Sequence, residues 1–369
     1  MKRIKLIATG GTISAHHDNR ADFRNYVTGH YSGRELLETV PELWAVAEVE
    51  VEDLAGISST HISADHWLQL RALVQRSLSR DGYDGVVITH GTNTLEETAY
   101  FLHLTVDTDK PIVLTGAQRP LSSLSTDAHA NLLAAVRTAA ADEARGKGVL
   151  VVLNDQISCA REVTKTSTYR LETFRSGDLG PLGFVDPDDR VVFLRAPTRR
   201  HTSGSEFARI EITALPAVEI VYSYAGARGD IIRFLTGTGR VRGIVVAGTG
   251  AGRCSGEEER ALREAVAAGV RGLVLGEEPQ AGRDLRGAEQ LWGQRDHAGD
   301  EVVLDQGFAD VAFAGLLGGH RAVGHDDAGA AAGAELGDDV LHPGEVGVAG
   351  GRGAEAPARV VGPAVPVRH

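Results

Sequence analysis

Two threonine-bearing turns of this 369-residue chain each follow a short apolar run directly. They are Ala8-Thr9-Gly10-Gly11-Thr12-Ile13 and Thr89-His90-Gly91-Thr92-Asn93-Thr94-Leu95-Glu96-Glu97-Thr98. In open parallel α/β sheets, ligands bind in the crevice at the carboxyl ends of the strands. A threonine hydroxyl is a poor nucleophile until a neighbouring base takes its proton. The two turns therefore suggest a nucleophile and a partner that positions water.

Each turn taken alone also has a purely structural interpretation. A Gly-Gly pair after a strand is often a tight turn, and a threonine before a helix is often an N-cap. Phosphate binding is a weaker alternative, because no Gly-Lys-Ser/Thr follows the glycines and the Gly-x-Gly-x-x-Gly spacing is absent. A catalytic interpretation needs further motifs.

Four separated strings supply them, in the order Thr9–Ile13, His90–Ala99, Leu114–Pro120 and Arg161–Thr166. Together they resemble the bacterial-type L-asparaginase (asparaginase/glutaminase) family of two-domain amidohydrolases, from about Lys2 to about Val270. The resemblance implies hydrolysis of L-asparagine to L-aspartate and ammonia through a threonine acyl-enzyme, with L-glutamine as a second candidate substrate. It implies no cofactor.

The resemblance also implies four catalytic residues. Thr12 matches the nucleophile, and Tyr26 matches the tyrosine of a mobile lid that closes beside it. Thr92 matches the second catalytic threonine, and Lys165 the lysine hydrogen-bonded behind it. Ammonia leaves readily only when protonated, so either Tyr26 or the Thr92–Lys165 pair must move a proton. Lys165 could instead be an ordinary exposed lysine, but it is the last lysine of the chain and stands inside a matching motif.

A second set of residues is implied to bind the substrate. Ser59 matches the serine that holds the α-carboxylate, and Thr60 stands where the family has a polar side chain on the α-groups. Backbone N–H groups around Thr92 and Ala117 are expected to stabilise the tetrahedral oxyanion. The expected binding set is Gly11, Ser59, Thr60, Gly91, Thr92, Asn93 and Ala117.

Asn93 departs from the family pattern, which reads His-Gly-Thr-Asp-Thr. The aspartate would pair with the substrate's α-ammonium, whereas asparagine keeps a carbonyl acceptor and loses the charge-assisted bond. Loss of a nearby anion should also lower the pKa of Lys165 and make it a better base.

The pattern of elements predicts an α/β fold with a parallel sheet. Strands are expected at 4–8, 85–88, 111–115, 148–153, 218–222 and 243–247, and helices at 66–78 after a capping Ser63, at 95–104 and at 127–145. We expect a larger N-terminal asparaginase domain at 1–190, a linker at 191–216, and the start of a smaller, incomplete C-terminal α/β domain at 217–272.

The composition of the chain limits which partners and which cellular compartment we expect. A net charge of −12 without a basic cluster argues against nucleic acid and anionic membranes as partners. His16, His17 and His30 lack a cysteine or paired acid at ligand spacing, so no metal is expected. Two cysteines, Cys159 and Cys254, and the absence of an apolar leader or membrane-spanning run predict free thiols and a cytoplasmic protein.

The last part of the chain, 273–369, has an aberrant Gly/Ala-rich composition. From Gly256 to His369 there is no Ser, Thr, Asn, Ile, Lys, Tyr, Met or Cys. This composition is typical of GC-rich DNA read in a shifted frame, and a natural Ala/Gly-rich tail is the alternative. The family completes each active site with an acid from a neighbour's C-terminal domain and assembles as a tetramer, a dimer of dimers. That acid has no identifiable position here.

Of two other classes of protein, one stays open beside the amidohydrolase and one is disfavoured. One is a catalytically compromised relative, either a pseudogene product or an amide-binding protein, which Asn93 and the aberrant tail favour. The other is the asparaginase-like subunit of a tRNA-dependent amidotransferase. That subunit would need an added N-terminal domain, and none precedes Thr9 in this sequence.

Overall fold

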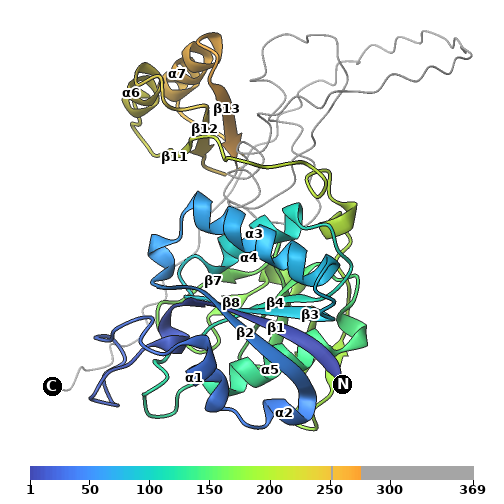
Figure 1. The fold of residues 1–369 in the computed structure, drawn as a ribbon. Coiled ribbons are helices and arrows are strands. Elements are labelled where there is room, and N and C mark those ends of the chain that lie inside the picture. The colour runs from blue at the N-terminus through green and yellow to red at the C-terminus, as the bar shows by residue number, and fades with distance from the viewer. Residues whose placement is uncertain (251, 276–369) are drawn as a thin grey trace, which may run out of the picture. The chain divides into compact units, whose positions relative to one another are not determined.

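The computed structural model describes residues 1–250 and 252–275 (Figure 1). The aberrant tail therefore lies outside the described residues from position 276 onward. The larger sheet has eight strands in the order β10-β9-β6-β5-β4-β3-β1-β2. Its strands are β1 (Lys2–Gly10), β2 (Ala47–Ile57), β3 (Gly85–Thr89), β4 (Ile112–Thr115), β5 (Val149–Leu153), β6 (Gln156–Cys159), β9 (Gly183–Val185) and β10 (Val191–Phe193).

The predicted α/β fold with a parallel sheet is confirmed, and the sheet continues on one side into antiparallel strands that were not predicted. Strands β1 to β5 pair in parallel, whereas β6, β9 and β10 join in antiparallel pairs. The reversal occurs at Asn154 and Asp155, which have φ values of 51° and 61° and form a two-residue hairpin between β5 and β6. Such a turn needs positive φ at both residues, which Asn and Asp tolerate better than most.

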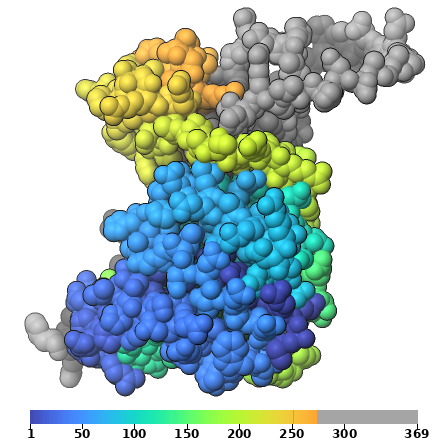
Figure 2. Space-filling view, in the orientation of Figure 1, coloured from blue at the N-terminus to red at the C-terminus, as the bar shows by residue number. Residues whose placement is uncertain are grey.

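Helices cover both faces of the sheet. On one face lie α1 (Gly33–Glu38), α2 (Leu43–Val46) and α5 (Ala128–Ala140), and on the other lie α3 (Ala64–Ser79) and α4 (Leu95–Thr105) (Figure 1). Side chains of β3 alternate between two buried clusters, because Val87 packs on the α5 face and Val86 and Ile88 pack on the α4 face. Strands β2 and β10 are the two edge strands. The blue N-terminal part of the chain forms much of the face shown in Figure 2.

The predicted helices are confirmed, with one boundary corrected. Helix α3 begins after Ser63, whose backbone N–H donates to Nδ1 of His66 (3.2 Å). Helix α5 ends at Ala140, earlier than the predicted 145, because Ala141 is extended and a short 3-10 turn follows at Asp142–Ala144. Acidic Asp142 is also unfavourable at the negative end of a helix, and it pairs with Lys2 instead (2.7 Å).

The segment 191–216 contributes to the larger sheet and its core. It begins with β10, which pairs with β9, and its Phe207 and Ile212 are buried in the cluster that also holds residues of α4. A separate two-stranded ribbon joins β7 (Thr164–Lys165) to β8 (Phe174–Arg175).

Three strands within residues 217–250 and 252–275 form a parallel sheet in the order β11-β12-β13. Its elements are β11 (Val218–Tyr222), α6 (Asp230–Gly237), β12 (Gly243–Ala247), α7 (Gly256–Ala267) and β13 (Arg271–Leu275). Ile232, Ile244 and Leu262 belong to its own buried cluster. The division of the chain into domains, with the boundaries given above, stays our prediction.

Two further features concern compartment and redox state. Cys159 is buried and Cys254 is half-buried, and both are free thiols, as predicted. Within residues 1–250 and 252–275, no helix combines the length and the apolar character that crossing a membrane requires.

Candidate active site

The expected catalytic turns meet at the carboxyl ends of the central strands of the larger sheet. Strand β3 lies between β1 and β4, and the three strands are parallel, so their carboxyl ends point the same way. The residues that follow these ends are Gly11-Thr12, His90 to Thr92, and Gly116-Ala117. The hydroxyl of Thr9 donates to the carbonyl of Thr89 (2.9 Å), which ties the first two turns together.

Glycines allow these turns to approach each other closely. Gly11 has a φ of +86°, and a Cβ atom there would lie 2.3 Å from Cα of Gly91. A Cβ atom on Gly91 would lie 2.9 Å from the side chain of Ser59, and one on Gly116 would lie 3.1 Å from Cγ2 of Thr92. Gly91 thus packs against both Gly11 and Ser59, which brings the turns that carry these residues together.

The first hydroxyl pair is Thr12 and Tyr26. Thr12 is buried in a 3-10 turn at Thr12–Ser14, and its Oγ1 lies 2.9 Å from the Tyr26 hydroxyl. Either oxygen can donate this hydrogen bond. A proton can therefore pass between the two hydroxyls without any rearrangement of the backbone.

The segment that carries Tyr26 is held in place from several sides. Val27 exchanges backbone hydrogen bonds with His16 (3.0 Å each), and the backbone N–H of His17 donates to Oγ of Ser122 (2.9 Å). The His16 ring stacks on His30, with ring centroids 4.5 Å apart, and its Nδ1 lies 2.7 Å from the Tyr31 hydroxyl. These histidines brace the base of the segment.

The second pair is Thr92 and Lys165, as expected. The Lys165 ammonium donates to Oγ1 of Thr92 (2.7 Å) and to Oδ1 of Asn93 (3.0 Å). Burial lowers the pKa of Lys165, and the nearby Glu96 carboxylate opposes that shift. The direction agrees with the expectation from Asn93, but the main cause is burial of the ammonium.

The expected α-carboxylate and oxyanion residues lie in the adjoining turns. Ser59 is buried, and its carbonyl accepts a hydrogen bond from the Thr94 hydroxyl (2.8 Å). Oγ1 of Thr60 lies 2.9 Å from Oγ of Ser58 at the exposed side of the same turn. Ala117 is buried after β4, and Asp127 fixes the next turn by accepting from the N–H of Gln118 (3.0 Å).

A buried hydrogen-bond chain behind the second turn was not predicted. Nδ1 of His90 lies 2.7 Å from the Gly91 carbonyl, and its Nε2 lies 3.0 Å from the Thr98 hydroxyl. The Trp67 indole N–H donates to the same hydroxyl (2.8 Å). Because a carbonyl only accepts, the proton sits on Nδ1, and Nε2 accepts from Thr98. Burial of the ring lowers the pKa of His90, so the ring that contacts Thr98 is neutral.

The burial of His90 in this hydrogen-bond chain predicts that the protein is less stable in acid. Burial of the ring lowers the pKa of His90 from 6.5 to about 4, so the unfolded state binds more protons between these values. Stability is therefore full above about pH 6.5 and is lost as the pH falls towards 4. When the pH falls from 7 to 5, we expect the free energy of unfolding to decrease by about 2 kcal/mol because of His90. Urea titrations of the wild type and of His90→Gln at both pH values measure it, and equal losses in the two proteins would contradict it.

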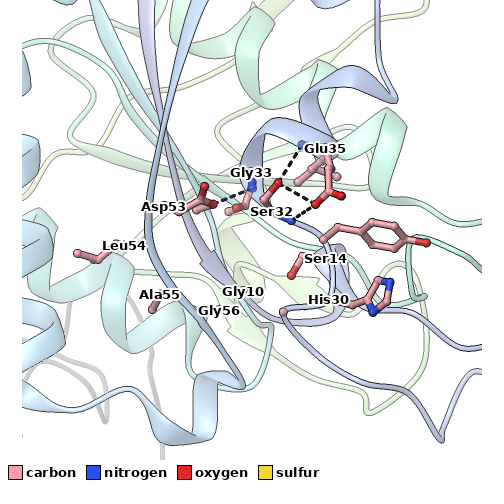
Figure 3. A pocket seen from close by; sticks show the side chains of 15 residues that line it. Gly10, Ser14, His30, Ser32, Gly33, Glu35, Asp53, Leu54, Ala55 and Gly56 are labelled. Atoms are coloured by element: carbon pink, nitrogen blue, oxygen red, sulfur yellow. Dashed lines mark hydrogen bonds between the residues drawn. The ribbon is translucent and has the colours of Figure 1, made fainter.

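A cavity of about 450 Å³ lies beside Gly10 and Ser14 (Figure 3). Its lining includes Ser32, Glu35 and Asp53, but none of the four expected catalytic residues. These polar groups already have partners, since Asp53 accepts from the N–H of Gly33 (2.7 Å) and Glu35 accepts from the N–H of Ser32 (2.8 Å). We assign this cavity no chemistry.

Comparisons with known proteins agree with the geometry. The family model "Asparaginase, N-terminal" matches residues 3–199. "L-asparaginase 2" of Bacillus subtilis is 38% identical over 300 residues, covering 79% of each chain. "Glutaminase-asparaginase" of Pseudomonas fluorescens is 39% identical over 290 residues, again 79% of each chain. The solved structure of a "probable cytoplasmic L-asparaginase" from Campylobacter jejuni is similar with a TM-score of 0.74 at 36% identity, covering 79% of this chain and 89% of that one.

Proposed function

The chain belongs to the asparaginase family, and from this premise we propose that it hydrolyses L-asparagine to L-aspartate and ammonia with Thr12 as the nucleophile. The observation that carries the proposal is the pairing of two threonine hydroxyls with two proton carriers near the carboxyl ends of the central strands. Thr12 lies 2.9 Å from the Tyr26 hydroxyl, and Thr92 lies 2.7 Å from the Lys165 ammonium. A threonine nucleophile needs a neighbour that takes its proton, and the Tyr26 hydroxyl, in hydrogen-bond contact with Thr12, can pass that proton on.

The proposed first half-reaction forms an ester. Oγ1 of Thr12 attacks the side-chain amide carbon, and its proton passes through Tyr26 or the Thr92–Lys165 pair to the amide nitrogen. Backbone N–H groups around Thr92 and Ala117 stabilise the oxyanion. The C–N bond breaks once the nitrogen is protonated, so ammonia leaves and an aspartyl ester remains on Thr12.

The second half-reaction hydrolyses that ester. Thr92 and Lys165 orient a water molecule and accept its proton, and the water oxygen attacks the ester carbon. The bond to Oγ1 of Thr12 breaks, the proton returns to that oxygen, and aspartate is released. The lowered pKa of Lys165 supports this role, because a neutral amine can accept a proton.

Ammonia release from L-asparagine tests the proposal. Parallel assays with L-glutamine test the proposed second substrate, which the name of the Pseudomonas fluorescens relative supports. The competing proposal is a compromised, amide-binding relative, which Asn93 favours. Calorimetric binding of asparagine without ammonia release would select that alternative.

Asn93 provides a kinetic prediction. Asn93→Asp restores an anion 3.0 Å from the position of the Lys165 ammonium and within reach of a substrate α-ammonium. We expect KM for asparagine to fall about tenfold, because a charge-assisted hydrogen bond contributes about 1–2 kcal/mol. Steady-state assays of both proteins measure the change. An unchanged or higher KM would mean that the site binds the substrate's α-ammonium equally well with the neutral Asn93 side chain.

We also propose that the active form is a homo-oligomer, a tetramer built as a dimer of dimers. The family resemblance supports this oligomer. The proposed frameshift beyond about Val270 would remove the part of the C-terminal domain that the family uses for assembly. A chain with the frame restored should elute as a larger, compact oligomer with higher activity than the present chain, since an Ala/Gly-rich tail offers little apolar surface to bury. Size-exclusion chromatography with an ammonia assay compares them. Equal size and activity would contradict the frameshift.

A cytoplasmic location is a further proposal. The two free thiols and the description of the Campylobacter jejuni protein support it. A Haemophilus influenzae relative is described as periplasmic, which is the competing location. Fractionation of the native cells decides between them, and asparaginase activity recovered in the periplasm would contradict the proposal.

A further inference from the structure

Glu96, in the first turn of α4, holds the short strand that carries Lys165. Its Oε2 accepts from the backbone N–H of Lys165 (2.5 Å), and its Oε1 accepts from the hydroxyl of Thr164 (2.9 Å). One carboxylate thus binds both residues of β7. Hydrogen bonds to an ionised carboxylate are stronger than neutral ones, and a bidentate arrangement also fixes orientation.

Strand β7 has little other support of this kind. It is two residues long and pairs only with the equally short β8 in the described part of the chain. Such a two-stranded ribbon is marginally stable by itself. The bonds from Glu96 therefore connect the ribbon to the helix that begins three residues after Thr92.

Thr92 lies three residues before this helix, and Glu96 in the first turn of the helix holds Lys165. The 2.7 Å contact between the Lys165 ammonium and Oγ1 of Thr92 depends on both ends being fixed. We propose that Glu96 is a positioning residue that sets the Thr92–Lys165 distance for catalysis. This inference rests on the proposed roles of Thr92 and Lys165.

The charge of Glu96 adds a second, measurable effect. Lys165 is faced by the hydroxyl of Thr92, the amide of Asn93 and the carboxylate of Glu96. Burial lowers the pKa of Lys165, and the Glu96 anion raises it. Removal of that anion should move the Lys165 pKa further down, which a merely structural role for Glu96 would not do.

Glu97 supplies a matched control. It belongs to the same first turn of α4, is half-buried, and forms no hydrogen bond or ion pair within residues 1–250 and 252–275. Glu97→Gln removes an acid from the same helix start without touching β7. It therefore controls for the general effect of a negative charge near the helix N-terminus.

The experiment compares Glu96→Ala, Glu96→Gln and Glu97→Gln in the same full-length parental chain. We expect Glu96→Ala to lower kcat for asparagine about 100-fold with little change in KM, because loss of positioning by about 1 Å costs that much. Glu96→Gln should fall between Glu96→Ala and the parent, and its kcat–pH profile should move to lower pH. Glu97→Gln should have the same kcat and the same kcat–pH profile as the parent.

A double-mutant cycle with Lys165→Met separates this inference from the proposed function. If Glu96 acts through Lys165, Glu96→Ala should cost nothing further in the Lys165→Met background. Fully additive losses would overturn the inference, and so would parental kcat in Glu96→Ala beside a large loss in Lys165→Met. Parental kcat in Lys165→Met would instead overturn the proposed catalytic role of Lys165, on which this inference rests. If Glu96→Ala does not fold, Glu96→Gln and Thr164→Val enter the same cycle.

Discussion

Replacing Thr12 with alanine should abolish nearly all ammonia release, with a loss in kcat of about 10⁴-fold or more. The substitution removes the only atom of this residue that can form the proposed ester. It leaves the Gly10-Gly11 turn and the buried backbone around it unchanged, so KM for asparagine should stay close to the parental value. Steady-state kinetics of the purified variant measure both constants.

Thr12→Ser is the matched control, because it keeps the hydroxyl and removes one methyl group. We expect it to retain far more activity than Thr12→Ala. Substantial turnover in Thr12→Ala, comparable with that of the serine variant, would show that another group attacks the amide. Thr92 would then be the first residue to test, since it lies at the neighbouring strand end.

Replacing Lys165 with methionine should lower kcat about 10³-fold, within the usual range for loss of a general acid or base. Methionine keeps much of the apolar stem and removes the ammonium that donates to Thr92 (2.7 Å) and Asn93 (3.0 Å). Any limb of the kcat–pH profile that arises from the lowered pKa of Lys165 should also disappear.

Lys147→Met provides the control for loss of a lysine elsewhere. Lys147 lies just before the amino end of β5, whereas the two threonine-bearing turns follow the carboxyl ends of β1 and β3, and its ammonium lies 4.8 Å from the centre of the Phe193 ring. That variant should keep parental kcat. Equal kinetics for Lys165→Met and Lys147→Met would remove Lys165 from the mechanism and leave Tyr26 as the proton carrier.

The central parallel strands could be predicted because their sequences are continuous apolar runs. Gly85–Thr89 is buried throughout, as is typical of a strand covered on both faces. Strand β2 was missed although Glu48, Val49 and Glu50 alternate between exposed and buried positions. That alternation belongs to an edge strand, and the acidic residues gave the segment a loop-like composition.

The antiparallel part of the larger sheet was beyond the sequence interpretation for a different reason. Strands β9 and β10 have three residues each, too few to show a period. The two-residue turn at Asn154-Asp155 was the available signal, because an Asn-Asp pair between apolar runs favours a hairpin. It follows β5 directly and marks where the parallel order ends.

The proposed catalytic roles of Thr12, Thr92 and Lys165 come from separated sequence motifs, whereas the contacts that hold these residues in place were not predicted. Glu96 and Thr164 stand inside two of those motifs, but only the fold reveals that one carboxylate spans both residues of β7. The chain from Trp67 to His90 joins residues far apart in sequence. Spacing along the sequence carries no information about such contacts.

Detection of the covalent intermediate tests the central claim most directly. The enzyme is mixed with a slowly turned-over asparagine analogue, quenched in acid, digested and analysed by mass spectrometry. We predict an acyl adduct on the peptide that contains Thr12 and its absence in Thr12→Ala, while Thr92→Val still forms it. An adduct on the peptide that contains Thr92, with the Thr12 peptide unmodified, would contradict the account and reverse the roles of the two threonines.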